Sequence, residues 1–586
     1  MRSRHTFFTF SVCFPVCTVR FSVGRPRPSM RHRNSRKPGH EQLSAAEPKP
    51  LPDEASSPAQ DDRARRVRDI LSRKQLSLLQ VSVASAQIFG AGTPYHVPHN
   101  LYYDLRNCQF TPNLHQFIAL SSISGYSLYD WFSIFGIYLD NIVRMQMQLS
   151  FPRTVLLDTN EYDFHAVMPR LEHKGRALNS ITPFHQVISQ TSPQPVGMLL
   201  RSNKQRFLYA KLGSEDTLPF PELLPGSVVR VEPQGDQTRL PGVAGGVSRH
   251  LYLLEHSGGL SCSRVRQIAP GRLVLVPSDR NGSDVELRLG SEVRVLGAID
   301  MEVRRFQNLA FFPRSRVRTK WRPEGLPPPG HAASDLGHLI SSRRQRNGLS
   351  FRQASTMSNL IAAELGDEQY SAAFGSLSDY EAVDTPPRHV QKVLSLCILY
   401  SISFWDFLQT AKLAIDKLGT EPMPEELAAH SSSASISGER SIVGQSPNES
   451  GMQNDLVDRF AEIPYFLRHV LPELTGMSRI SMRDVFWIEN GGPDFQWPLR
   501  GAVLLVVNRR IKRLALTESQ PGERRNMYLF MRRDGSFACG HIGRDRQITL
   551  LHDTTGAVPS TTMRLGPDAD MVGQVVACLR HIEPVG

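Results

Sequence analysis

Residues 119–132 read ALSSISGYSLYDWF, and residues 395–408, which lie 276 positions later, repeat this pattern as SLCILYSISFWDFL. In both stretches an apolar segment leads through a short polar turn into Ser-x-x-Asp. A serine at that place is typical of a helix N-terminus, because its side-chain oxygen accepts the free N–H groups of the first turn. The two stretches therefore predict equivalent pairs of helices, with Ser127 and Ser403 as N-caps.

The same separation, which we call the repeat offset, recurs across more than two hundred residues of the chain. Chance matches would not keep one spacing over such a length, so the sequence predicts a tandem duplication of one unit. The other features matched at or near the repeat offset are Leu76-Ser77 with Leu349-Ser350, Thr111-Pro112 with Thr385-Pro386, Gly226 with Gly501, Gly258-Gly259 with Asp534-Gly535, and Gly297 with Gly573.

The positive charge of the chain is concentrated in two segments. The net charge is +12, but residues 1–40 carry nine Arg and Lys and residues 303–323 carry seven, both without an acid. The remainder has a net charge of −4, so the folded parts are not strongly basic. We expect the linker cations Arg314, Arg316, Arg318, Lys320 and Arg322 to contact the phosphate backbone of a nucleic acid without reading its bases.

The use of cysteine indicates a reducing compartment, and the hydropathy of the chain bears on targeting and membrane insertion. The seven cysteines are scattered without a CxxC pair, which argues against a zinc ribbon and against a disulfide scaffold. Residues 7–19 faintly resemble a secretory signal, but Pro15 interrupts them and Arg20 ends them. We interpret this segment as a disordered tail or as untranslated upstream sequence, with Met30 as the start in the second case. No run reaches membrane-spanning length, so we expect a cytoplasmic protein.

The first part of each unit is predicted to be helical. Ser77-x-x-Gln80 and Ser350-x-x-Gln353 read as capping boxes, and Thr111 and Thr385 as N-caps followed by proline. Asn347-Gly348 is expected to end the first helix of the second unit. The expected core residues are Leu336, Leu339 and Ile340 on one helix, Val390, Val393, Leu394, Cys397 and Ile398 on another, and the aromatic residues Trp131, Phe132, Trp405 and Phe407.

The second part of each unit is predicted to be a mostly antiparallel β domain. Gly258-Gly259 and Asp534-Gly535 are hairpin signals at equivalent places. The fold class expected for the chain is therefore α+β multidomain. The predicted strands are Val228–Val231, Leu251–Leu254, Leu273–Val276 and Val293–Leu296 in the first unit, and Val503–Val507, Met527–Phe530, Ile548–Leu551 and Met571–Val576 in the second.

The helical part of the second unit resembles the Cro/cI-type (XRE-like) helix-turn-helix family. The resemblance rests on Leu339-Ile340-x-x-Arg343-x-x-Arg346-x-Gly348-Leu349-Ser350, on Leu377-Ser378-Asp379-Tyr380-Glu381, and on the segment 403–408; residues 67–135 are a more divergent version. In that family the third helix enters the major groove and the helix before it crosses the backbone. By position, the third helix is expected near residues 375–383, and near residues 99–106 in the first unit. The resemblance implies DNA contacts from Arg352, Ser376, Ser378 and Tyr380, and in the first unit from Asn100, Tyr102, Tyr103 and Arg106.

Two features separate this segment from the family pattern. About a dozen extra residues lie between the second and third helices, around 361–374 and 86–98. In addition, residues 376–381 hold two acids and no Arg, Lys, Asn or Gln, the residue types that usually read guanine and adenine. An alternative therefore stays open, in which the chain is a sensor or interaction scaffold that does not bind DNA.

The β parts resemble the LexA-like, signal-peptidase-type fold found downstream of such helix-turn-helix domains. The resemblance rests on Tyr209-x-x-x-Gly213-Ser214, on Leu224–Val229, on Leu251–Leu254 and on Val295-Leu296-Gly297. Active members use a serine nucleophile and a lysine base, and Ser214 matches the nucleophile position. The strand after Gly258-Gly259 reads Ser261-Cys262-Ser263-Arg264, and Phe537–His541 likewise has no lysine. Arginine cannot replace the base because its guanidinium stays protonated. The chain is therefore not expected to be an enzyme.

No cofactor or metal site is expected from the remaining motifs. His96-x-x-His99 near Cys108, and Cys539-x-His541, lack a second ligand pair. The partners expected are double-stranded DNA and, for the β parts, a small-molecule effector or a second copy of the chain; a membrane is not expected. We expect the protein in the cytoplasm, at the nucleoid.

These expectations divide the chain into seven segments. They are a disordered basic tail (1–62), a first helix-turn-helix domain (63–150), a first LexA-like β domain (151–310), a basic Pro-rich linker (311–333), a second helix-turn-helix domain (334–418), a Ser-rich flexible linker (419–452) and a second LexA-like β domain (453–586).

Overall fold

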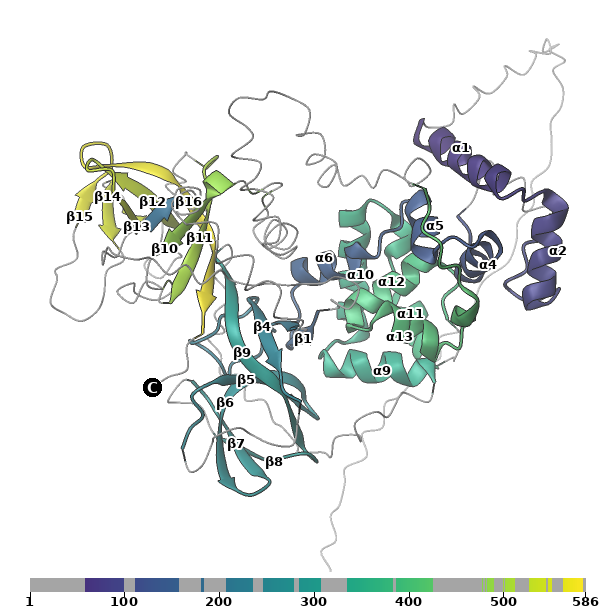
Figure 1. Ribbon diagram of the computed structural model, residues 1–586. Coiled ribbons are helices and arrows are strands. Elements are labelled where there is room, and N and C mark those ends of the chain that lie inside the picture. The colour runs from purple at the N-terminus through teal and green to yellow at the C-terminus, as the bar shows by residue number, and fades with distance from the viewer. Residues whose placement is uncertain are drawn as a thin grey trace, which may run out of the picture. The chain divides into compact units, whose positions relative to one another are not determined.

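The computed structural model shows helices and antiparallel strands in one α+β chain (Figure 1). Ten α-helices, three short 3₁₀ helices and sixteen strands lie within the described residues, which are 58–99, 111–157, 181–183, 207–235, 246–278, 284–306, 335–382, 386–424, 477, 480, 482–488, 499, 501–511, 526–543, 546–550 and 562–582.

The helices of the first half begin at side-chain caps. Ser77 and Gln80 form the expected capping box, and Ser127 accepts the N–H of Asp130 as predicted. The prediction for Thr111 was wrong: the next helix begins at Leu114, and its capping box joins Asn113 to Gln116. Asn113, two residues after Thr111, is an equally good N-cap, and this start places Pro112 before the first turn. The helices are α1 (Pro58–Arg73), α2 (Leu78–Phe89), α4 (Leu114–Ser124), α5 (Leu128–Ile134) and α6 (Asp140–Gln148).

The helices of the second half repeat this order. Ser350 and Gln353 form a capping box, Asn347 is the C-cap of the helix before it, and Ser403 caps the last helix, all as predicted. His389 is the N-cap residue of α12, without a side-chain bond, and Thr385 lies outside the described residues. The elements are α9 (Leu336–Arg346), α10 (Phe351–Leu365), η1 (Glu368–Tyr370), α11 (Phe374–Ala382), α12 (Val390–Tyr400), α13 (Phe404–Thr410) and η2 (Ile415–Lys417).

The two helical halves share one hydrophobic core. The ring centroids of Phe132 and Phe404 lie 5.9 Å apart, and the N–H of Leu114 donates to the carbonyl of Arg388 at 2.8 Å. Helix α12 was expected to bury a single stripe, but it is buried almost all round because it lies within this joint core. Trp405 was expected in the core and is 39% exposed, whereas Trp131, Phe132 and Phe407 are fully buried.

The strands form two β units with the same order of pairing. In the first unit, β9 pairs with β4 and with β5, and β6, β7 and β8 follow β5 in order across the sheet. In the second unit, β16 takes the place of β9, pairing with β11 and with β12, and β13, β14 and β15 follow β12. The strands are β1 (Val155–Leu156), β2 (Ile181–Pro183), β3 (Leu208–Lys211), β4 (Val228–Pro233), β5 (Leu251–His256), β6 (Gly259–Ala269), β7 (Arg272–Val276), β8 (Val285–Arg288), β9 (Val293–Arg305), β10 (Val485–Ile488), which follows η5 (Met482–Asp484), β11 (Ala502–Asn508), β12 (Met527–Arg532), β13 (Phe537–Ile542), β14 (Gln547–Leu550), β15 (Thr562–Arg564) and β16 (Ala569–His581).

Irregular positions recur at equivalent places of the two β units. The register of β4 on β9 shifts between Arg230 and Val231, and that of β11 on β16 shifts between Val506 and Val507. A Cβ atom on Gly297 would lie 2.0 Å from the carbonyl oxygen of Glu232. A Cβ atom on its match Gly573 would lie 2.6 Å from the carbonyl oxygen of Asn508. Only glycine allows this approach of two strands beside a bulge.

Backbone conformations recur in the same way. Seventeen of the described residues have a positive φ, and all of them except Gly92 form pairs at or near the repeat offset. The pairs are Gln75 with Gly348, Gly90 with Gly366, Gly125 with Ser401, Gly136 with Lys412, Gly226 with Gly501, Gly259 with Gly535, Gly271 with Arg546, and Gly290 with Gly566.

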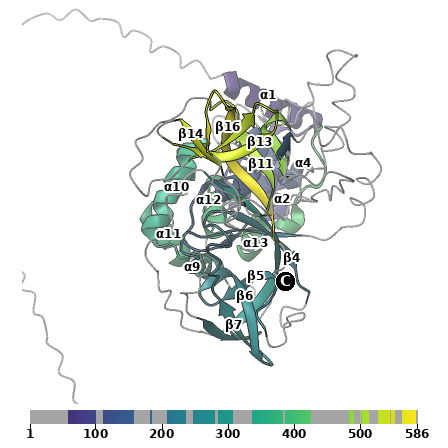
Figure 2. The ribbon, with the colours of Figure 1, turned by 90° about the vertical axis from the view of Figure 1, so that its left-hand side faces the viewer.

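The two β units are joined by pairing of β9 with β16. Val303 pairs with Leu579, and these two positions are separated by the repeat offset. Around this centre the strands run antiparallel, from Met301 opposite His581 to Arg305 opposite Ala577. Figure 2 shows β16, in yellow, reaching the teal strands of the first β unit. The pairing is thus symmetric about Val303 and Leu579, as it is between two subunits related by a two-fold axis.

Candidate nucleic-acid interface

Helices α10 and α11 form the helix pair in which the sequence predicts DNA contacts. Helix α11 spans Phe374–Ala382, within one residue of the expected third helix. Between the helices, η1 is fixed by hydroxyl groups: Ser395 donates to the carbonyl of Tyr370 at 2.5 Å, and Ser358 accepts the N–H of Ala372 at 2.9 Å. The extra residues of this connection are therefore a short 3₁₀ turn held against α10 and α12.

An ion pair holds α11 against α9. The guanidinium of Arg344 binds both carboxylate oxygens of Glu381, at 2.5 and 3.0 Å, and both side chains are largely buried. Leu377 is fully buried beside them. Gly337 allows the close approach, because a Cβ atom there would lie 2.6 Å from the carbonyl oxygen of Glu381. One of the two acids in segment 376–381 is therefore neutralised inside the fold and does not face a ligand.

The described candidates lie at the start of α10 and along α11. The rings of Phe351 and Phe374 are in contact at 5.5 Å, which brings the N-termini of α10 and α11 together. Arg352 follows Phe351 and is exposed, as expected for a backbone contact. On α11, Ser376, Ser378 and Tyr380 are half-buried, and burial together with Asp379 raises the pKa of Tyr380. Asp379 is exposed on the outer face of α11, where its charge would repel phosphate.

The first helical half repeats the scaffold, but its candidate residues lie outside the described residues. These are Asn100, Tyr102, Tyr103 and Arg106, together with the linker cations Arg314, Arg316, Arg318, Lys320 and Arg322. The scaffold before them is defined: Ser85 accepts the N–H of Val97 at 3.1 Å, as Ser358 does from Ala372. Sequence reasoning missed this repeated serine, whose signal was its recurrence near the repeat offset.

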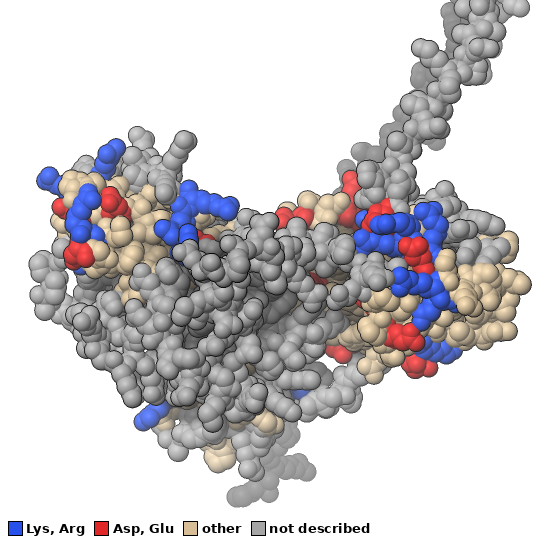
Figure 3. Space-filling view, turned by 45° about the horizontal axis from the view of Figure 1, so that its top comes forward, with Lys and Arg blue, Asp and Glu red and all other residues tan. Residues whose placement is uncertain are grey.

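Acids accompany the cations on the surface of the helical part. Helix α1 carries Arg63, Arg65, Arg66 and Arg68, but Asp62 forms ion pairs with two of them, at 2.8 Å with Arg66 and with Arg65. On the face shown in Figure 3, blue and red groups lie side by side among the described residues. The described surface in this view therefore carries separate basic groups, and not a continuous basic band.

Ser214, which matches the nucleophile position in the LexA-like resemblance, lies in the turn after β3. Its N–H donates to the carbonyl of Phe151 at 2.9 Å, and the residue is half-buried. The strand expected to carry the base is β6, where Arg264 binds the carboxylate of Glu222. Sequence reasoning missed Lys211, three residues before Ser214. Burial lowers the pKa of Lys211 to about 7, and its Nζ donates to the carbonyls of Leu149 at 2.7 Å and of Met147.

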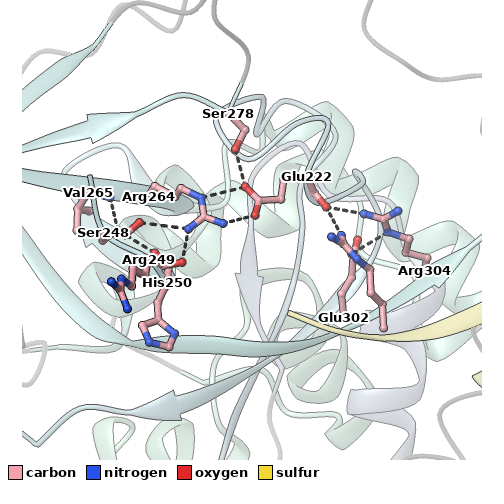
Figure 4. A network of polar contacts seen from close by, with 10 residues as sticks. Glu222, Ser248, Arg249, His250, Arg264, Val265, Ser278, Glu302 and Arg304 are labelled. Atoms are coloured by element: carbon pink, nitrogen blue, oxygen red, sulfur yellow. Dashed lines mark hydrogen bonds and ion pairs between the residues drawn. The ribbon is translucent and has the colours of Figure 1, made fainter. Parts of the chain in front are cut away.

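A network of arginines and glutamates lies in the first β unit (Figure 4), and Arg580 of the second unit joins it. The carboxylate of Glu302 is fully buried and accepts from Arg304 at 2.7 Å and from Arg580 at 3.3 Å. Both arginines also donate to the carbonyl of Glu222, Arg580 at 2.6 Å. Arg304 and Arg580 are equivalent residues of the repeat, and Cys578 occupies the place equivalent to Glu302. A single carboxylate therefore serves both arginines at the pseudo-two-fold centre.

The first β unit also contacts the second helical half. Arg153 donates to the carbonyls of Gly258, at 2.7 Å, and Gln345, at 3.1 Å, so it connects the β5–β6 turn to the end of α9. Glu255 of β5 pairs with Arg346 of α9. Burial and these arginines lower the pKa of His256 to about 3. The N–H of Gly258 donates to Nδ1 of His256, so Nε2 carries the ring proton and donates to Ser261 at 3.0 Å. In this arrangement the imidazole is the donor to Ser261 and does not accept the proton of its hydroxyl.

Metal ligation and membrane insertion find no support within the described part of the chain. Among these residues there is no group of three or more His, Cys, Asp or Glu that could hold a metal; His96 and His99 belong to them and Cys108 does not. No single described helix is long and apolar enough to cross a membrane. Only α12 and α13 together reach the required length, and they are bent by 113° and buried in the core.

No protein-family model matches this chain, and no curated protein sequence matches it.

Proposed function

We propose that the chain is a DNA-binding transcriptional regulator of the Cro/cI-like type, with two helix-turn-helix heads in one polypeptide. In this proposal each unit consists of such a head and a LexA-like β domain, and the two units arose by tandem duplication. The protein would act at the nucleoid, in the cytoplasm. Its ligand is duplex DNA, and its two heads occupy two half-sites about one helical turn, ~34 Å, apart.

The observation that carries the proposal is the symmetric register of β9 on β16. Pairing is centred on Val303 and Leu579, which are equivalent positions of the repeat. Regulators of this kind normally use a dimer to present two heads to a two-fold related site. Here one chain has the same internal symmetry, since both the β units and the helical halves are paired within it. A built-in pair also allows the two heads to diverge and to read an asymmetric site.

The β units serve in this proposal for pairing and sensing, without peptidase activity. In β6 the place of the base holds Arg264, which is bound to Glu222 and cannot give up its proton. Lys211, the buried lysine nearest in sequence to Ser214, already donates to two backbone carbonyls. The contact of Arg153 between the β5–β6 turn and α9 would carry a signal from a bound small molecule to the second head.

The decisive experiment is selection of duplexes from a random pool with the purified full-length chain at two salt concentrations. We expect enrichment of a two-part motif at both salt concentrations and weaker total retention at the higher one. A pool of single-stranded DNA of the same length is the control. Retention that depends on salt but enriches no motif would leave only backbone affinity and would refute sequence reading.

A second candidate function is a sensor or interaction scaffold that does not bind DNA. It is favoured by Asp379, exposed on the outer face of α11, and by the exposed aliphatic side chains Leu79 and Val83 on α2. This function predicts that the selection retains no duplex above background even at low salt. Retention of duplex in a salt-dependent manner would exclude it.

A further inference from the structure

The helix before the recognition helix has the same frame in both halves, so its residues can be matched one to one. Helices α2 and α10 each begin with a capping box, at Ser77 and Ser350. In both, a buried serine donates to the carbonyl three residues earlier and accepts an N–H from the following loop: Ser85 in α2 and Ser358 in α10. These two serines stand at the same distance along the chain from their capping serines, which fixes the alignment.

The outward faces of these two helices differ in chemistry. In α10, Arg352, Thr356 and Asn359 are exposed at spacings of four and three, which places them on one face. Asn359 accepts the hydroxyl of Ser371 at 2.5 Å through its carboxamide oxygen, and that bond does not use its two N–H donors. The matched residues of α2 are Leu79, at 66% exposed, Val83, at 41%, and Ala86, which is half-buried. Gln80 and Gln87 are also exposed on α2, and Gln87 stands where α10 has the exposed Leu360.

These two faces would respond differently to a phosphate backbone. A guanidinium forms charge-assisted hydrogen bonds with phosphate oxygens, and each such contact releases counterions from the DNA. Aliphatic side chains offer no donor, so phosphates beside them would lose hydration without compensation. In the family geometry the helix in question is the one that crosses the backbone.

Resting on the proposed function, we propose that the two heads contribute unequally to DNA affinity. Arg352 on α10 binds backbone phosphate and anchors the second head, whereas the matched residues Leu79, Val83 and Ala86 of the first head make no phosphate contact. The first head is then held at its half-site by its covalent and core connection to the second.

The test compares three variants of the full-length chain on the selected duplex over a series of salt concentrations. Arg352→Leu should weaken binding about tenfold for every sequence and reduce the slope of log K against log salt by about 1. Arg352→Lys keeps the charge and should keep the slope. The double variant Leu79→Ala/Val83→Ala should bind within about twofold of wild type with the same slope, because truncated aliphatic groups release no counterions.

Each outcome bears on the inference. An unchanged slope in Arg352→Leu, or a slope reduced equally by the Leu79→Ala/Val83→Ala variant, would overturn the unequal contribution while leaving DNA binding intact. Loss of slope in Arg352→Lys as well would overturn the contribution of Arg352 by counterion release, because lysine keeps the positive charge. Absence of salt-dependent duplex binding in the wild type would refute the proposed function itself, and this inference with it.

Discussion

Lys211, the last residue of β3, is buried, and burying its charge lowers the stability of the fold. Its side chain is 5% exposed and donates to two carbonyls near the end of α6. Burial, with Arg305 nearby, lowers its pKa from 10.5 to about 7. The lower pKa in the folded state adds to the free energy of unfolding above pH 10.5, and this contribution is lost as pH falls towards 7.

We therefore expect the free energy of unfolding to rise with pH between 7 and 10 by at most about 1.4 kcal/mol per pH unit from this residue. Lys211→Met should flatten that rise, as measured by urea unfolding at pH 7, 8 and 9. Burial raises the pKa of Asp216 to about 6, so its opposite contribution is already lost below this window. Lys412→Met, at an exposed lysine, is the control and should keep the wild-type slope. A Lys211→Met slope equal to wild type would contradict the prediction.

Ser401 has a left-handed backbone conformation, and the equivalent residue of the first half, Gly125, is a glycine. It ends α12 at φ 51°, where Gly125 ends α4 at φ 77°. A Cβ atom disfavours this left-handed region, and the Ser401 hydroxyl is buried without a hydrogen-bond partner among the described residues. Ser401→Gly should therefore raise the free energy of unfolding by about 1 kcal/mol, and Gly125→Ser should lower it by a similar amount. Chemical denaturation of both variants tests this; destabilisation by Ser401→Gly would show that the serine side chain has a role of its own.

At the scale of elements, the joint between β9 and β16 depends on one carboxylate. Glu302 is fully buried and neutralises Arg304 and Arg580, both largely buried. In a symmetric pair each strand would supply its own acid, but Cys578 stands at the second position, and burial raises its pKa to about 12. The cysteine therefore stays neutral, and the two arginines have Glu302 in common.

Glu302→Gln should destabilise the protein by about 3–5 kcal/mol, because it leaves buried guanidinium groups without a counter-charge. The matched control is Glu286→Gln, which removes an ion pair with Arg272 in which the Arg272 and Glu286 side chains are 58% and 44% exposed. That change should cost less than about 1 kcal/mol. The free energies of unfolding of the two variants are compared by guanidinium chloride denaturation. Equal losses of stability would mean that the joint between the β units does not depend on Glu302.

Apolar runs predicted the longer strands of each β unit, and the hairpin signal after Gly258-Gly259 placed β6. All eight strands predicted from apolar runs are present, whereas the short strands β1, β2, β3, β8, β10 and β15 were not predicted. In β6, Ser263 and Arg264 are buried, which the sequence does not reveal because their partners are remote: Ser263 donates to Val276, and Arg264 binds Glu222. A run of polar residues reads as exposed unless the partners that satisfy them are known.

The candidate site was predictable to a similar degree. The position of α11 was expected from the resemblance to the helix-turn-helix family, and the place of Arg352 in the first turn of α10 follows from the capping box at Ser350. Glu381 and Arg344 lie far apart along the chain, so the sequence alone counted Glu381 as an acid on the reading face. Only the packing of α11 on α9 reveals that this charge is neutralised.

At the scale of the whole chain, the repeat extends to backbone detail. Bulges, left-handed residues and capping serines recur at or near one offset, from Gln75 and Gly348 in the helical parts to Gly290 and Gly566 in the β units. The pairing of β9 with β16 is centred on equivalent residues. Interactions that a homodimer makes between two chains are thus made here within one chain.

We expect a single chain to occupy each DNA site. The edges of β9 and β16 that would otherwise pair with a second copy are satisfied by each other, and the helical halves bury their shared core together. Mass photometry of the full-length chain should give a monomer of 65.7 kDa, and with a selected duplex it should give a complex that contains one chain. Raising the protein concentration tenfold is the control and should not change that ratio. Two chains on one duplex would mean that each chain engages a single half-site, so the internal pair could not be the arrangement that presents both heads to DNA.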